Sequence, residues 1–155
     1  MKRFIRRTIE SIKQIIFWFP IIWNTRDFDY GDILEMLELK MKRTYDFLTS
    51  KDCMSEQKEE DLLALKRCIE IISILYNQEY ETLAYEEHYN KYPIKPLEEW
   101  FIDDPKYPNC RVMKPMTEEE RNSFGLAGKD SEKSHSSLVK EFGRLFGKHY
   151  RCWWD

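Results

Sequence analysis

The placement of proline constrains the fold of this chain more than any other feature of its sequence. Five of the six prolines lie within residues 91–116. They exclude a long helix there, because proline lacks an amide proton and its ring clashes with the preceding helical turn. Outside this stretch proline occurs only at position 20, and apolar residues recur with a helical period. We therefore expect a mainly α protein, a small helical bundle with a long antiparallel helix hairpin and a Pro-rich irregular excursion.

Length and composition suit one folded domain. The chain has 155 residues, of which 42% are hydrophobic and 15% aromatic, so it has enough apolar surface to form a core. We expect a single helical domain over residues 1–155. Its expected parts are an amphipathic helix (1–19), a connector (20–31), a helix hairpin (32–90), the Pro-rich segment (91–116) and C-terminal helices (117–155).

Periodic apolar residues predict the first three helices. In the first helix they form one stripe, and Pro20 is expected to end that helix because proline disfavours helical backbone in the residue before it. The stripe consists of Ile5, Ile9, Ile12, Ile16 and Phe19. In the second helix, residues 32–50, the buried face is predicted at Ile33, Leu34, Leu37, Met41, Tyr45 and Leu48. A third helix, from about residue 56 to about residue 90, is predicted to bury Leu62, Leu65, Ile69, Ile72, Leu75 and Leu83.

The second half of the chain is less regular. We expect Trp100, Phe101 and Tyr107 to anchor the Pro-rich segment, with a short strand near Arg111–Met113. Residues 117–120 read as a capping box that starts a short helix, and glycines at 125 and 128 are expected to end it. Residues 129–137 are polar and are expected either to be the most mobile part of the chain or to form the start of the last helix, which is predicted over residues 138–154.

Charge and cysteine usage limit the partners and the compartment. The net charge of −3 gives no general attraction to DNA, so no DNA partner is expected. Residues 1–13 carry five basic and one acidic side chain, whereas residues 56–90 carry nine acidic and three basic ones, which suggests a basic helix docking on an acidic one within or between chains. The four cysteines form no C-x-x-C pair, which favours a reducing cytoplasm. The apolar run of residues 15–23 is too short to span a membrane, so a membrane partner is not expected.

One cluster of aromatic and charged residues in the connector is a candidate ligand site. Arg26 offers a planar donor group for a phosphate, and Trp23 and Tyr30 offer faces on which a base can stack. Asp27 and Asp29 can accept hydrogen bonds from ribose hydroxyls. The alternative is structural: an aspartate caps the next helix, the arginine pairs with an acid and the aromatics hold the connector to the core.

The C-terminus supplies a second cluster, Arg151, Trp153 and Trp154. Adjacent tryptophans on a helix point about 100° apart, so both cannot face one core, and one can contact a ligand or partner. His149 and Cys152 lie one turn apart, but no second pair has matching spacing, so His149 is expected to be a packing residue and no metal or cofactor is expected. Phosphate-binding and nucleophile motifs are missing, so an enzyme is the less favoured class.

The two ends of the chain together resemble a protein family. The sequence Trp-x-x-Arg-x-aromatic-Asp at residues 23–29 and the terminal Trp-Trp-Asp are similar to motifs in a widespread group of small uncharacterised tailed-phage proteins. The resemblance covers roughly the first 50 and the last 20 residues and brings no catalytic residues with it.

This resemblance implies a phage accessory protein acting in the cytoplasm of an infected bacterium. The expected function is counter-defence, in which a homo-oligomer binds and sequesters a nucleotide-type immune signal. Alternatives are a protein–protein inhibitor of a host protein or a virion-assembly accessory acting through helical surfaces, an enzyme that degrades such a signal, and a first helix lying flat on a membrane.

Overall fold

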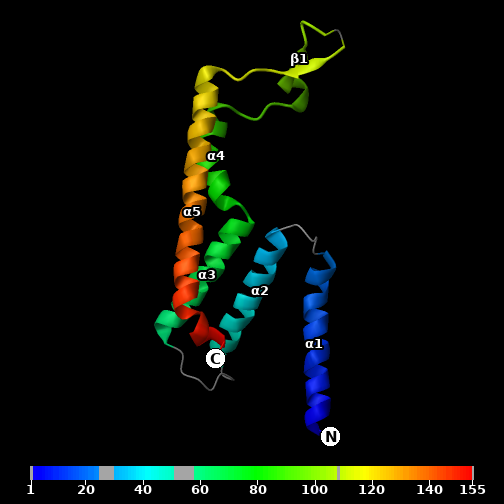
Figure 1. Ribbon diagram of the computed structural model, residues 1–155, viewed down its shortest axis with the longest axis vertical. Coiled ribbons are helices and arrows are strands. Elements are labelled where there is room, and N and C mark those ends of the chain that lie inside the picture. The colour runs from blue at the N-terminus through cyan, green and yellow to red at the C-terminus, as the bar shows by residue number, and fades with distance from the viewer. Residues whose placement is uncertain (1, 25–29, 51–57, 108, 155) are drawn as a thin grey trace. The chain divides into compact units, whose positions relative to one another are not determined.

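The structure, a computed structural model, describes residues 2–24, 30–50, 58–107 and 109–154. Helices account for most of these residues, and the described strands form one short two-stranded sheet, so the mainly α fold class is confirmed. The chain divides into two compact units (Figure 1). The first unit contains residues 1–76 and 145–155, and the second unit contains residues 77–144.

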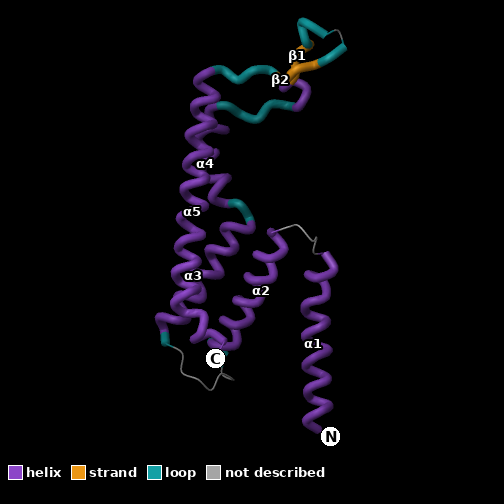
Figure 2. Tube along the Cα trace, viewed as in Figure 1, coloured by secondary structure: helices purple, strands orange, loops and turns teal. Residues whose placement is uncertain are grey.

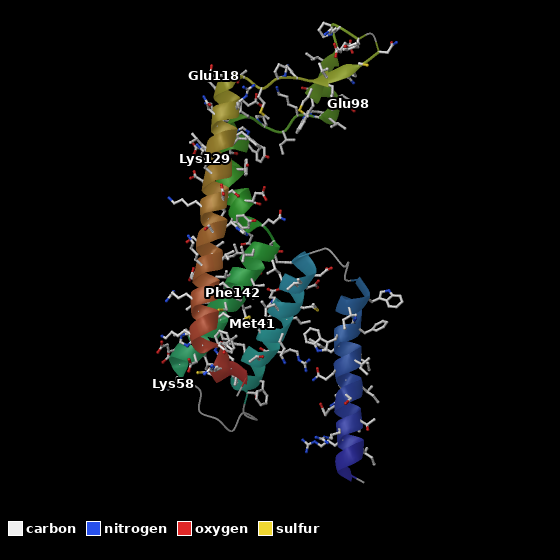
Figure 3. All side chains as sticks on the ribbon, in the orientation of Figure 1. Met41, Lys58, Glu98, Glu118, Lys129 and Phe142 are labelled. Atoms are coloured by element: carbon white, nitrogen blue, oxygen red, sulfur yellow. The ribbon has the colours of Figure 1, made fainter. Side chains whose placement is uncertain are left out.

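An antiparallel helix pair forms the core of the first unit. Helix α2 (Tyr30–Leu48) and helix α3 (Glu59–Tyr76) run in opposite directions (Figure 1), as the sequence predicts. Met41, labelled in Figure 3, is fully buried, and so are Leu65 and Ile71. Two residues predicted to be in the core are instead exposed: Ile33 at 62% and Leu83 at 70%.

Helix α1 (Lys2–Asn24) does not end at Pro20, contrary to the prediction. A proline inside a helix leaves the carbonyl group four residues earlier without its usual donor. Here that residue is Ile16, which is 67% exposed, so water can bind the freed carbonyl oxygen. The helix therefore continues for another turn and includes Trp23.

One side of α1 is apolar and exposed, and we call it the isoleucine face. Its side chains are between 47% and 75% exposed. The isoleucine face consists of Ile5, Ile9, Ile12, Ile15, Ile16, Phe19, Ile22 and Trp23. The periodicity in the sequence correctly identified this stripe, but the stripe does not contribute to the core.

The second unit begins where the predicted third helix breaks. Instead of one helix to about residue 90, the structure has α3, a turn, and then α4 (Glu79–Lys91). The break lies at Gln78, whose φ of 54° and ψ of 31° place it in the left-handed helical region. No glycine or proline marks this point, so the break could not be predicted from the residue types around it.

Helix α5 (Glu118–Trp154) is longer than predicted. It continues through Gly125 and Gly128, so the expected helix end is wrong. Residues 129–137 belong to the same helix, which agrees with the expectation that they are helical and not with the expectation that they are mobile. The N-terminal cap is confirmed in part, because the Thr117 hydroxyl accepts a hydrogen bond from the Glu120 amide at 3.2 Å. Gly128 also has a packing role: a Cβ atom there would lie 3.2 Å from the Tyr85 hydroxyl of α4.

A small hairpin projects between α4 and α5. It contains a 3₁₀ turn (η1, Leu97–Trp100) and two antiparallel strands, β1 (Phe101–Asp103) and β2 (Arg111–Met113), with Ile102 opposite Val112. The strand predicted near residues 111–113 is therefore confirmed. Loop segments connect the hairpin to both helices (Figure 2). Tyr107 is 56% exposed at the turn, so it does not anchor the segment, and the nearby thiol of Cys110 is free and exposed.

Candidate functional site

The residues expected to bind a ligand fall in three structural situations. Arg26, Asp27 and Asp29 lie outside the described residues, and the side chains of Tyr30 and Trp154 are likewise outside the description. Trp23 is 75% exposed at the end of α1, where its ring stacks on Phe19 with 5.3 Å between ring centroids. Arg151 is exposed, and its Nε donates to the hydroxyl of the neighbouring Tyr150.

Trp153, the last expected ligand residue, is a buried packing residue. It is 3% exposed, and its indole Nε1 donates to the main-chain carbonyl of Asp61 at 3.0 Å. One turn earlier, His149 Nδ1 lies 2.6 Å from the Asp61 carboxylate, and both side chains are buried. His149 is thus a satisfied packing histidine, as expected. This cluster connects the end of α5 to the start of α3. Its indole and imidazole already bind the carbonyl and the carboxylate of Asp61.

A cavity of about 300 Å³ in the second unit is the better candidate site, and we call it the hairpin pocket. Four segments form its walls: the end of α4, the loop into η1, the segment after β2 and the first turns of α5. Its lining residues are His88, Tyr89, Tyr92, Pro93, Ile94, Lys95, Glu99, Trp100, Met113, Lys114, Pro115, Met116, Thr117, Glu120 and Phe124. A second hollow, along Arg6, Arg7, Glu10, Ser11 and Gln14, is lined by one helix only, so no wall opposes it.

Local hydrogen bonds hold the walls of the hairpin pocket in place. The Trp100 indole donates to the Lys95 carbonyl at 2.7 Å, and the Lys114 amide donates to the Trp100 carbonyl at 2.7 Å. The first bond closes the segment that enters the hairpin on itself, and the second ties that segment to the one that leaves the hairpin. The end of α4 is closed by the Tyr92 amide, which donates to the His88 carbonyl at 2.7 Å.

Aromatic rings form the floor of the pocket. His88 is buried, and the rings of Tyr89, Tyr92 and Phe124 lie 5.3–5.4 Å from its ring, measured between centroids. Its Nδ1 lies 3.0 Å from the hydroxyl of Ser123 on α5. Ser123 is not a lining residue, so this pair connects α4 to α5 rather than facing a ligand.

Polar groups are few in the pocket but varied. Lys95 and Lys114 supply positive charge, and Glu99 and Glu120 supply negative charge. The Tyr92 hydroxyl is buried and makes no hydrogen bond of good geometry among the described residues. The nearby Lys91 ammonium still interacts with the Tyr92 side chain, and this interaction raises the pKa of Lys91.

Sequence reasoning missed this site. Its residues span positions 88–124 and form no local motif, and only the aromatic and proline content of the segment marked it as an ordered excursion. Among the described residues, no group of three or more histidine, cysteine or acidic side chains is arranged to hold a metal ion.

Comparison of the chain with protein-family models, with curated proteins and with solved structures found no match. The chemistry of the site therefore rests on its own geometry.

Proposed function

We propose that this protein binds a nucleotide-type ligand in the hairpin pocket and holds it without chemical change. The observation that supports this most directly is the composition of the pocket walls, where aromatic rings from separate segments lie beside two lysines. A cavity of about 300 Å³ is at the lower end of the range usual for small-molecule sites, which suits a ligand of mononucleotide size.

Each part of a nucleotide has a complementary group in the pocket. A base can stack on Trp100 or Phe124, which are 40% and 38% exposed and so still have ring surface to bury. Lys95 and Lys114 can neutralise a phosphate, and Glu120 can accept hydrogen bonds from ribose hydroxyls. A single anion would instead gain little from the apolar floor.

The resemblance of the two chain ends to small tailed-phage proteins supplies the biological setting of the proposal. In that setting the protein sequesters a nucleotide immune signal as an oligomer and so blunts host defence. Among the pocket residues, Thr117 is the only hydroxyl of serine or threonine type, and the only histidine, His88, is engaged by Ser123 outside the pocket. This arrangement favours binding over cleavage, because a hydrolytic site pairs its nucleophile with a base.

The first experiment is native mass spectrometry of the full chain purified gently from cells, followed by calorimetric titration with mononucleotides and cyclic dinucleotides. Trp100→Ala and the charge reversal Lys114→Glu should each weaken binding by about 5- to 150-fold, because base stacking and phosphate pairing are each worth about 1–3 kcal/mol. Tyr107→Ala is the matched control, since this exposed aromatic lies in the same hairpin but does not line the pocket.

Two results would contradict the proposal. Loss of binding in Arg26→Glu alone, with Trp100→Ala and Lys114→Glu unchanged, would place the ligand at residues 23–30 instead. If no nucleotide binds and the purified protein carries no added mass, the function is not nucleotide binding, and a pull-down for a host or phage protein becomes the next experiment.

A further inference from the structure

Helix α1 is oriented in an unusual way for a helix of a small folded protein. Its described contacts with α2 come from the side opposite the isoleucine face, where Arg43 of α2 donates to Gln14 Oε1 at 3.1 Å and its guanidinium lies 4.1 Å from the centre of the Phe17 ring. The isoleucine face lies on the other side of the helix and is exposed along its whole length. A helix that belongs to a core normally buries its apolar side and exposes its polar side.

The exposed face is continuous and large. At 100° per residue its eight side chains lie within an arc of about 140°, from one end of α1 to the other. Soluble monomers rarely expose an apolar patch of this extent without a partner. The isoleucine face is therefore expected to be covered by something when the protein works.

The charge on the helix selects the kind of partner. Residues 1–13 carry five basic side chains and one acidic side chain. Arg6 and Lys13 flank one edge of the isoleucine face and Arg7 flanks the other, when the residues are placed at helical spacing. A second copy of α1 packed in parallel on the same face would bring like charges together, whereas an anionic lipid surface offers both apolar depth and negative headgroups.

The remaining features of α1 agree with a helix lying in the plane of a membrane. It is strongly amphipathic but only weakly hydrophobic on average, and Trp23 lies at the end of its apolar face, a residue type enriched at the level of lipid headgroups. Within the described part of the chain, no helix has the length and apolar content needed to cross a bilayer.

We propose that α1 docks flat on an anionic membrane surface, with the isoleucine face among the acyl chains and its arginines and lysines at the headgroups. This inference is independent of the hairpin pocket, because no lining residue of the pocket belongs to α1.

The test is flotation of the full chain with vesicles of phosphatidylcholine alone or of phosphatidylcholine mixed with phosphatidylglycerol. The unchanged protein should float with the anionic vesicles, and far less with the neutral ones. The double variant Ile12→Glu with Ile16→Glu should weaken binding by more than about tenfold, because both side chains would have to carry a charge into the acyl region. Leu83→Glu, at a 70% exposed position on α4, is the matched control and should bind like the unchanged protein. Circular dichroism of each variant checks that the helices remain.

Three outcomes would overturn the proposal. In the first, the protein floats with neither kind of vesicle. In the second, the two isoleucine substitutions leave flotation unchanged. In the third, the protein self-associates in solution, the same substitutions abolish that association, and vesicles do not compete with it. This last result would assign the isoleucine face to a second copy of the chain.

Discussion

The buried pair of Asp61 and His149 gives the sharpest test of how the first unit is held together. The His149 Nδ1 and the Asp61 carboxylate oxygen are 2.6 Å apart, and their side chains are 6% and 10% exposed. His149→Phe fills a similar volume but removes the hydrogen bond and leaves a buried carboxylate without its histidine. We expect the free energy of unfolding to fall by about 2–3 kcal/mol, near the top of the range for an unsatisfied buried group.

The position of Asp61 sets the upper limit of that figure. Asp61 lies in the first turn of α3, where unpaired amides and the helix dipole favour a negative charge, so the carboxylate keeps some stabilisation after His149 is removed. Trp153 also continues to donate to the Asp61 main-chain carbonyl. The cost should therefore stay below the 3–5 kcal/mol that is typical of breaking a fully buried ion pair.

The assay is equilibrium unfolding in urea, followed by circular dichroism and by tryptophan fluorescence. Asp61→Leu, His149→Phe and the double variant form a thermodynamic cycle. The double variant should be more stable than the sum of the single effects by about 1.5 kcal/mol or more, since replacing both partners leaves no orphaned group. Asp46→Leu, an exposed position on α2, should change stability by less than about 0.5 kcal/mol. Strictly additive effects of the two substitutions would refute the reasoning.

Two further predictions concern α5. Gly125→Ala should raise the free energy of unfolding by about 0.5–1 kcal/mol, because alanine favours the helix and no atom beyond the neighbouring helical backbone lies within 4 Å of the new Cβ atom. Gly128→Ala should gain less or lose stability, since its Cβ atom would press on the Tyr85 hydroxyl. Thermal unfolding of the two variants compares them, and an equal gain in both would contradict this account. The Lys148 ammonium donates a hydrogen bond to Glu60 and lowers the pKa of that exposed carboxyl. The contribution of this pair to folding stability is therefore present above the unfolded-state pKa of Glu60 and is lost as the pH falls through the lowered value. Carboxyl chemical shifts should show a higher Glu60 pKa in Lys148→Ala, and an unchanged pKa would mean that the contact does not persist in solution.

Periodicity in the sequence located helical faces well but did not reveal what covers them. The spacing that placed Met41 and Leu65 in the core also found the stripe along α1. Both patterns have the same period, and only the three-dimensional contacts show that α2 and α3 bury theirs against protein while α1 does not. A single sequence therefore does not distinguish an apolar stripe that packs in the core from one that is exposed.

Predictions of helix ends from residue type failed at two positions, Gly128 and Gln78. Gly128 looked like a helix end, yet it lies inside α5, where the absence of a side chain makes room for Tyr85. Gln78 looked like an ordinary helical residue, yet it adopts a left-handed conformation and ends the helical run. The hairpin pocket was hidden for a related reason, because its walls are brought together by pairing across a hairpin rather than by spacing along one helix.

The exposed thiol of Cys110 gives the hairpin a practical use. It lies next to β2, in the same excursion that supplies Trp100 and Lys114 to the pocket, and it is free. With Cys53 and Cys152 replaced by serine, an environment-sensitive dye attached at this position would lie three residues along the chain from Met113, which lines the hairpin pocket, while the buried Cys68 would be shielded from labelling. The protein could then serve as its own fluorescent sensor, in which the emission colour reports whether the cavity is filled and allows candidate ligands to be screened directly in cell extracts.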